Sequence, residues 1–250
     1  MKIAIVGNGI VGGSLRRWIE KNHDYCECEV LIYDPGQNQY AAIHEASSVF
    51  ISVPVPTRLD ATQDYSILES TMTMTQPNQN IYIRSTVLPG TADSLALKYS
   101  RNVYAMPEFL TERTADADLA KSKVLVGGGL ERKDPLFEHL FARHKEIIRM
   151  SNTEAEMAKY AHNCFGALKV TFFNHIYKIC KDRKLDYQNV LHGTLASGYI
   201  NRDHTQVPGP DGHMGFGGTC FPKDLKAFAH WSKIDLLKQA SFDNEIFRGK

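Results

Sequence analysis

The chain has 250 residues, of which 29 are basic and 28 acidic, so no nucleic-acid or acidic-membrane partner is indicated. This length allows one large domain or two modest ones. No apolar run approaches the roughly 20 residues that span a bilayer, and no signal peptide opens the chain, so we expect a cytoplasmic protein. The cysteines lack metal-ligand spacing; we expect no metal, and reduced structural thiols at Cys26, Cys28, Cys164 and Cys180.

The N-terminal segment carries a glycine-rich turn after an apolar run. Residues 3–6 predict a buried parallel strand, followed by a GxGxxG pattern and a helix-like stretch over residues 14–20. A second apolar strand, over residues 30–33, ends at Asp34, close to the roughly 20-residue spacing of a carboxylate that binds the adenosine ribose. The helix N-terminus would offer free N–H groups to phosphates. Asp34 would repel a 2′-phosphate, so we expect NAD, bound by Gly7, Asn8, Gly9, Ile10, Val11, Gly12 and Asp34.

Further apolar strands, over residues 48–53, 81–87, 102–105 and 123–126, alternate with helix-like stretches. The pattern predicts an α/β fold, with a Rossmann-like doubly wound parallel sheet over residues 1–150. An α-helical dimerisation and substrate domain is expected over residues 151–250. Ligands collect at the carboxyl ends of parallel strands, so one crevice should hold the residues just past the strand ends, namely Pro54, Thr57, Thr86 and Glu108.

A long helix is predicted to begin after a capping box formed by Ser151 and Glu154, and to reach about Lys184. Its apolar residues recur at three- and four-residue spacing, and its length of roughly 45 Å exceeds that of a typical globular helix. Part of it should therefore pack against another subunit, which predicts a homodimer. Close helix packing could explain Gly166. A loop over residues 198–214 and a final helix over about 224–247 complete the expected organisation.

The segment from Gly215 to Asp224 combines three glycines with Cys220 and Lys223. Glycines allow close backbone approach to a ligand. Lys223 provides a cationic neighbour that favours a thiolate, which is the nucleophilic form of cysteine. Read alone, the segment could equally be a glycine-rich turn with a buried cysteine. The dinucleotide signal at the N-terminus favours a catalytic cysteine.

Taken in order, these motifs resemble the UDP-glucose/GDP-mannose dehydrogenase family over nearly the whole chain. The resemblance rests on residues 7–12, 53–57, 85–91, 107–112, 159–163 and 215–224. It implies an N-terminal Rossmann domain and a central helical domain. It also implies oxidation of a sugar C6 alcohol to a carboxylate with two NAD, and we expect the conversion of UDP-glucose to UDP-glucuronate. The residues do not say which nucleotide sugar is taken.

The resemblance also implies roles for individual residues. Cys220 would form a thiohemiacetal and then a thioester. Lys159 and Asn163, on one helical face, would donate to the developing oxyanion. Thr86 and Asp224 would position water, with Glu108 as general base. Further cofactor contacts are expected from Pro54, Thr57, Ser85, Thr86, Glu112 and Lys223. Substrate contacts are expected from Glu108, Phe109, Leu110, Glu112, Lys159, Asn163, Gly215, Phe216, Gly217 and Gly218.

The sequence departs from the family beyond Asp224, because it stops at Lys250 where family members continue into a third, nucleotide-gripping domain. We therefore expect a short form of the enzyme. Two alternatives stay open. A β-hydroxyacid dehydrogenase shares the Rossmann start and a Lys-x-x-x-Asn pair but needs no cysteine. A non-catalytic NAD-binding relative would account for the missing domain.

Overall fold

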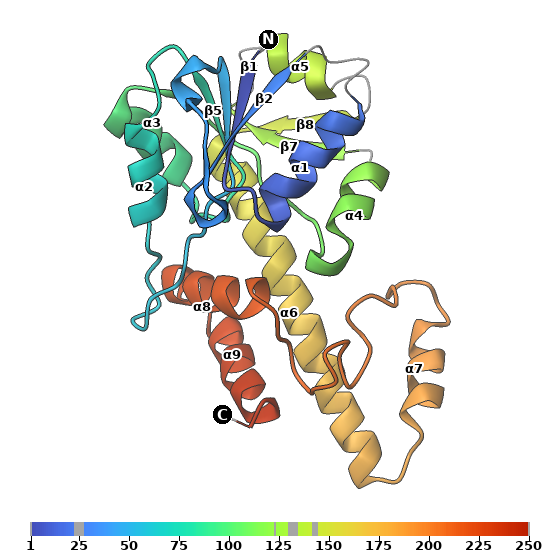
Figure 1. Ribbon diagram of the computed structural model, residues 1–250. Coiled ribbons are helices and arrows are strands. Elements are labelled where there is room, and N and C mark those ends of the chain that lie inside the picture. The colour runs from blue at the N-terminus through green and yellow to red at the C-terminus, as the bar shows by residue number, and fades with distance from the viewer. Residues whose placement is uncertain (1, 23–27, 123, 130–134, 142–144, 250) are drawn as a thin grey trace. The chain divides into compact units, whose positions relative to one another are not determined.

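The computed structural model describes residues 2–22, 28–122, 124–129, 135–141 and 145–249 (Figure 1). Cys26 lies outside these ranges. The chain forms two compact units, which are described separately: the first comprises Met1–Pro56 and Gln63–Lys159, the second Thr57–Thr62 and Tyr160–Lys250. The domain boundary expected at residue 150 stays a prediction. No helix within the described ranges is long and apolar enough to cross a membrane.

The first unit is built on a six-stranded sheet in the order β3-β2-β1-β4-β5-β6. All neighbouring strands are parallel except β2 and β3, so the predicted α/β fold is confirmed. Strands β4 and β5 are shorter than the predicted 48–53 and 81–87, which leaves Ser52 to Val53 and Arg84 to Val87 as loop. The strands are β1 (Lys2–Val6), β2 (Glu29–Asp34), β3 (Gln39–Tyr40), β4 (Ser48–Ile51), β5 (Asn80–Ile83) and β6 (Asn102–Ala105).

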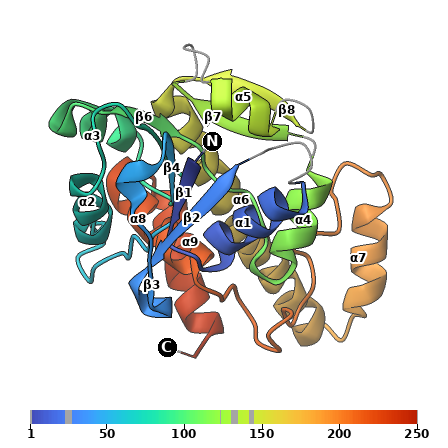
Figure 2. The ribbon, with the colours of Figure 1, turned by 45° about the horizontal axis from the view of Figure 1, so that its top comes forward.

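Helices cover both faces of this sheet, with α1 on one side and α2 and α3 on the other (Figure 2). The side-chain alternation of β1 explains the two layers. Ile3 and Ile5 join the apolar cluster that includes Leu15 and Ile19 of α1. Ala4 and Val6 join the cluster that includes residues of α2 and α3. The helices of this part are α1 (Ile10–Lys21), α2 (Ser66–Thr73), α3 (Thr91–Tyr99) and α4 (Ala115–Lys121), with short 3₁₀ turns at Pro35–Gln37, Ile43–Glu45 and Glu112–Thr114.

The strand expected over residues 123–126 as part of the main sheet does not belong to that sheet, so this prediction is corrected. Residues 124–128 form β7 (Val124–Gly128), which pairs in parallel with β8 (Glu146–Met150) in a separate sheet beside α5 (Pro135–Phe141). The edge of β6 is occupied instead by the side chain of Asn152. Its Oδ1 accepts the N–H of Ala105 at 2.7 Å, and its Nδ2 donates to the carbonyl of Val103 at 3.1 Å. The edge strand is thus closed by an amide rather than by another strand.

The second unit consists mainly of helices, in which α6 (Asn152–Asp182) is the long helix predicted from the sequence. The boundary between the units falls inside α6, between residues 159 and 160. The capping box is present: the Glu154 carboxylate accepts the N–H of Ser151 at 2.8 Å. A short helix, α7 (Tyr187–Leu195), was not expected. The predicted final helix is two helices, α8 (Cys220–Ser232) and α9 (Asp235–Phe247), because Lys233 adopts a left-handed conformation with φ 60°.

Aromatic contacts hold α8 on α6 within the second unit. The ring of Tyr160 stacks on that of Phe228 with 4.8 Å between centroids. At Gly166 a Cβ atom would lie 2.6 Å from Cζ of Phe221, closer than any real carbon contact. The expected close packing at Gly166 is therefore confirmed, and its partner is the residue next to Cys220.

Candidate functional site

The glycine turn after β1 has the backbone of a dinucleotide-binding loop. Gly7 has φ +85°, and a Cβ there would lie 2.6 Å from the carbonyl oxygen of Ser52. At Gly12 a Cβ would lie 1.9 Å from the carbonyl oxygen of Gly7, so helix and turn touch directly. Gly9 meets nothing within 4 Å and is the N-cap of α1, which no side chain of the described residues caps. The N-terminus of α1, where Ile10 and Val11 lie, therefore fits a phosphate group.

Asp34 ends β2 and is tied to this turn. Its Oδ2 accepts the N–H of Asn8 at 2.7 Å. The amide of Gln37 donates to the carbonyl of Asn8 at 2.8 Å, and Asn8 Nδ2 donates to Gln39 Oε1 at 3.0 Å. These two glutamines were not expected from the sequence, although they follow Asp34 closely. The Asp34 carboxylate thus lies beside the glycine turn. A carboxylate in this place fits the adenosine ribose of NAD, and the turn fits its pyrophosphate.

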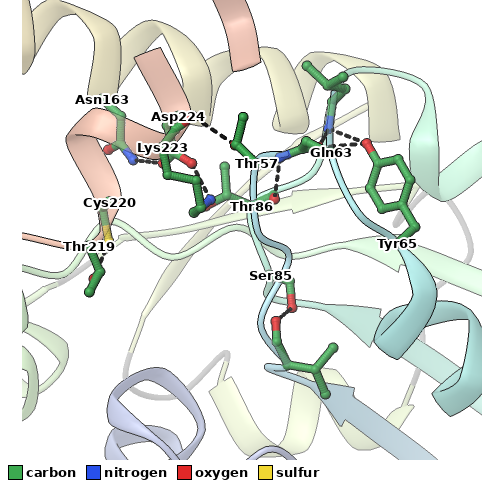
Figure 3. A network of polar contacts seen from close by, with 12 residues as sticks. Thr57, Gln63, Tyr65, Ser85, Thr86, Asn163, Thr219, Cys220, Lys223 and Asp224 are labelled. Carbon is green, nitrogen blue, oxygen red and sulfur yellow. Dashed lines mark hydrogen bonds and ion pairs between the residues drawn. The ribbon is translucent and has the colours of Figure 1, made fainter. Parts of the chain in front are cut away.

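The loop after β5, which carries Ser85 and Thr86, is held by side chains from the segment just before α2 (Figure 3). Gln63 Nε2 donates to the Thr86 carbonyl at 3.3 Å, and Gln63 Oε1 accepts the N–H of Leu88 at 3.0 Å and the hydroxyl of Tyr65 at 2.6 Å. Ser85 Oγ donates to the carbonyl of Val53 at 2.7 Å. The Thr86 hydroxyl makes no hydrogen bond to the described residues, so it is available to a ligand.

A small pocket of the first unit brings Thr86 together with Lys159. Its lining also includes Pro107, just before Glu108, and the carboxyl-bearing Glu156. Lys159 is buried, with its Nζ 5.4 Å from the centroid of the Phe109 ring. A buried ammonium group over an aromatic face is a cation–π arrangement. The predicted site residues Ser85, Thr86 and Lys159 therefore line one cavity of this unit.

Glu156 is a pocket residue that sequence reasoning missed. Its two carboxyl oxygens accept the N–H groups of Gly90 at 2.6 Å and Ala92 at 2.8 Å, at the start of α3. Burial raises the pKa of Glu156 to about 7, aided by the neighbouring charge of Asp93 and opposed by the backbone hydrogen bonds. The signal that could have found it is its position one turn before Lys159 on the same helix.

Glu108 lies just past β6 and is buried in an ion pair with the fully buried Arg84, the residue after β5. The other carboxylate oxygen of Glu108 accepts the N–H of Phe109 at 2.7 Å. Leu110 packs against the apolar cluster of α1, whereas Glu112 is exposed in a 3₁₀ turn. Glu108 and Phe109 therefore lie with Lys159 in one region of the first unit. Leu110 instead packs against the apolar core, and Glu112 lies at the surface.

In the second unit, Cys220 is the first residue of α8 and is exposed, whereas Cys164 and Cys180 are buried; Cys28, in the first unit, is also buried. Burial and the charge of Asp224 raise the pKa of Cys164 to about 12, so that thiol stays protonated at neutral pH. The Thr219 hydroxyl lies 3.7 Å from Sγ of Cys220. A thiol at a helix N-terminus faces free N–H groups, which is the setting of a reactive cysteine.

The glycine loop before Cys220 is clamped by amides from two helices. Asn174 Oδ1 accepts the N–H of Gly215 at 2.9 Å, and Asn244 Oδ1 accepts that of Phe216 at 2.7 Å. A Cβ at Gly217 would lie 2.2 Å from an Arg248 nitrogen. Gly215 and Gly218 both have positive φ, at 73° and 74°. The clamping residues were missed because no local pattern links them to the loop.

Asn163, Lys223 and Asp224 form a polar group near Cys220 (Figure 3). Asn163 Nδ2 donates to Asp224 Oδ2 at 2.6 Å, and the Lys223 ammonium pairs with the fully buried carboxylate of Asp224. Lys223, expected to favour the Cys220 thiolate, thus has Asp224 as its ion-pair partner. Thr57 Oγ1 donates to the Lys223 carbonyl at 3.0 Å. Within the described ranges no cluster of residues could hold a metal ion.

Comparison with known proteins identifies both parts of the chain. The model of the UDP-glucose/GDP-mannose dehydrogenase family, NAD binding domain, matches residues 33–145, and that of the family's central domain matches residues 153–244. The expectation of NAD as cofactor is thereby confirmed. A UDP-glucose 6-dehydrogenase of Pseudomonas aeruginosa is 27% identical, with 99% of this chain and 64% of that protein covered. The chain therefore spans less than two thirds of that relative's length.

Solved structures share the fold. A UDP-glucose dehydrogenase from Pyrobaculum islandicum matches with a TM-score of 0.85 at 22% identity, covering 98% of this chain and 68% of that one. A 3-hydroxyisobutyrate dehydrogenase from Mycobacterium tuberculosis matches with a TM-score of 0.69 at 17% identity, covering 96% of this chain and 91% of that one.

Proposed function

Because the chain belongs to the UDP-glucose/GDP-mannose dehydrogenase family, we propose that it is an NAD-dependent nucleotide-sugar 6-dehydrogenase that converts UDP-glucose to UDP-glucuronate. The observation that carries this proposal is the exposed Cys220 at the N-terminus of α8, next to the Asn163–Asp224 pair. A dehydrogenase that stops at the aldehyde needs no thiol. The second step of a four-electron oxidation requires a tetrahedral adduct of the aldehyde from which hydride can leave, and a thiolate supplies one.

NAD, when bound, supplies the hydride acceptor for both oxidations. In the first, the C6 alcohol loses its hydride and its hydroxyl proton, which passes to a water held by Thr86 and Asp224. The Cys220 thiolate then adds to the aldehyde carbon, and the adduct oxygen takes a proton back from that water. The thiohemiacetal next loses a second hydride while its hydroxyl proton returns to the water, which leaves a thioester. Water attacks that carbonyl, its proton passes to Glu108, and the C–S bond breaks with its electron pair leaving on sulfur.

Lys159 and Asn163 are proposed to donate to the oxygen that becomes negatively charged in these steps. Lys159 is buried beside the Phe109 ring, where a charge is poorly screened and therefore acts strongly on a developing oxyanion. Asn163 is buried with its amide oriented by Asp224. Their separation by four residues on α6 follows the helical repeat.

We also propose that the chain forms a homodimer through α6. Within the second unit, Phe165, Phe172 and Ile179 are 68%, 55% and 53% exposed and recur every seven residues. Such a regular apolar stripe is typical of a helix that packs against another helix. A strictly monomeric species in sedimentation at micromolar concentration would contradict this proposal. The cytoplasmic location stays a prediction.

Incubating the purified chain with NAD and, separately, UDP-glucose, GDP-mannose and a 3-hydroxy acid tests the proposed reaction. We expect NADH from UDP-glucose. NADH from the hydroxy acid alone, undiminished in Cys220→Ser, would favour the second candidate, a β-hydroxyacid dehydrogenase. The M. tuberculosis 3-hydroxyisobutyrate dehydrogenase shares the fold of this chain. NAD binding without NADH from any of them would favour a non-catalytic relative.

A further inference from the structure

Arg84 is a buried charge that the proposed mechanism leaves unused. It follows β5 directly, two residues before Thr86, and its side chain is fully buried. Burial lowers its pKa to about 10, so the guanidinium is still charged at neutral pH. Glu108 is its ion-pair partner, and its Nε and Nη1 have no hydrogen-bond partner among the described residues.

The carboxylate of Glu108 is fixed from two sides. One oxygen is paired with Nη2 of Arg84, and the other accepts the N–H of Phe109 at 2.7 Å. The Phe109 ring in turn lies against the Lys159 ammonium. The Arg84–Glu108 ion pair is thereby linked through Phe109 to Lys159 within the first unit. A buried carboxylate without a cationic partner would be strongly destabilised in its charged form.

We propose that Arg84 is the positioning residue of Glu108, holding it ionised and oriented as the proton acceptor for the attacking water. This inference rests on the proposed function. The neighbouring Arg84 charge favours the charged form of the Glu108 carboxyl, which is the form that accepts a proton from water. Loss of that charge would leave a larger share of the buried carboxyl protonated. The proton accepted by Glu108 comes from the water O–H bond, and the hydroxyl oxygen goes to the thioester carbon.

A purely structural Arg84 would only anchor the segment after β6. Its replacement would shift how Glu108 titrates, since any ion-paired cation favours the charged carboxylate, but the rate of thioester hydrolysis would not follow that shift. The two roles therefore separate when the Glu108 titration midpoint is compared with the pH profile of hydrolysis.

The test follows the carboxyl carbon of Glu108 by NMR in ¹³C-glutamate-labelled protein, with the signal assigned by its loss in Glu108→Gln. In Arg84→Met we expect the titration midpoint of Glu108 to rise by about one to three pH units, the shift that loss of a neighbouring opposite charge produces. Arg84→Lys, which keeps the charge, should restore most of the wild-type midpoint. If Arg84→Met does not fold, Arg84→Gln provides the same neutral comparison.

An unchanged midpoint in a folded neutral variant would overturn the inference, as would a midpoint in Arg84→Lys that matches the neutral variants. In active enzyme, the acid limb of the rate of thioester hydrolysis should move with the midpoint, and a limb that stays in place would overturn the inference. The NMR result does not depend on turnover. A chain that forms no NADH but shows the shift would refute the proposed activity alone, whereas an active chain without the shift would refute the role of Arg84 alone.

Discussion

Replacement of Glu156 by glutamine should remove a pH dependence of stability that the wild-type chain carries. Glu156 is buried at the start of α3, and its pKa rises from its ordinary 4.5 to about 7, first because of burial and then because of Asp93. In the unfolded chain the same carboxyl titrates near its ordinary value. Between these two pH values the folded state binds a proton that the unfolded state does not.

The sign follows from this difference in proton binding. The stabilisation by protonated Glu156 is fully present below pH 4.5 and is lost as the pH rises through about 7. At about 1.36 kcal/mol per pH unit, the interval corresponds to about 3 kcal/mol. The free energy of unfolding of wild type, minus that of Glu156→Gln, should therefore fall by about 3 kcal/mol between pH 4 and pH 8.

Urea unfolding of both proteins at several pH values measures this difference. Glu154→Gln is a matched control on the same helix: hydrogen bonds from Ser151 lower the pKa of the exposed Glu154, so the wild-type advantage should grow as the pH rises through the ordinary glutamate range. A wild-type minus Glu156→Gln difference that stays constant from pH 4 to 8 would refute the burial argument. A difference that grows would mean that the N–H groups of Gly90 and Ala92 outweigh burial.

Two further predictions concern the cofactor turn and the packing of α8. Asp34→Asn should reduce the preference for NAD over NADP about tenfold, since it removes the charge that repels a 2′-phosphate; dissociation constants for both cofactors measure this, and an unchanged ratio would contradict it. Gly166→Ala should lower the free energy of unfolding by about 1 kcal/mol or more, because the new Cβ meets Phe221 at 2.6 Å. Gly193→Ala, in α7 with nothing within 4 Å, should raise it by about 0.5–1 kcal/mol, and equal gains at both positions would contradict the packing argument.

Features set by local sequence could be predicted. The glycine spacing after β1 demands a tight turn, and the close approaches at Gly7 and Gly12 are those that the pattern implies. The capping box depends on two residues three positions apart, Ser151 and Glu154, and the tight contact at Gly166 depends on the absence of a side chain there. Asp34 lies against the turn because its strand neighbours β1.

Features set by side chains far away in the sequence could not be predicted. The edge of β6 is closed by Asn152, some 47 residues along the chain, so nothing in the strand itself excludes a further strand. The left-handed Lys233 that separates α8 from α9 carries no glycine, proline or asparagine signal. Asn174 and Asn244 clamp the glycine loop from helices whose sequence patterns report only their apolar faces. The Arg84–Glu108 pair needed the neighbouring positions of β5 and β6 to be known.

The most direct test of a four-electron, thiol-dependent oxidation is the number of NADH molecules formed per UDP-glucose consumed, with NAD in excess. Wild type and Cys180→Ala, which alters a buried thiol, should both give two. Cys220→Ala should abolish the second NADH. One NADH per sugar in wild type, or two in Cys220→Ala, would contradict the account.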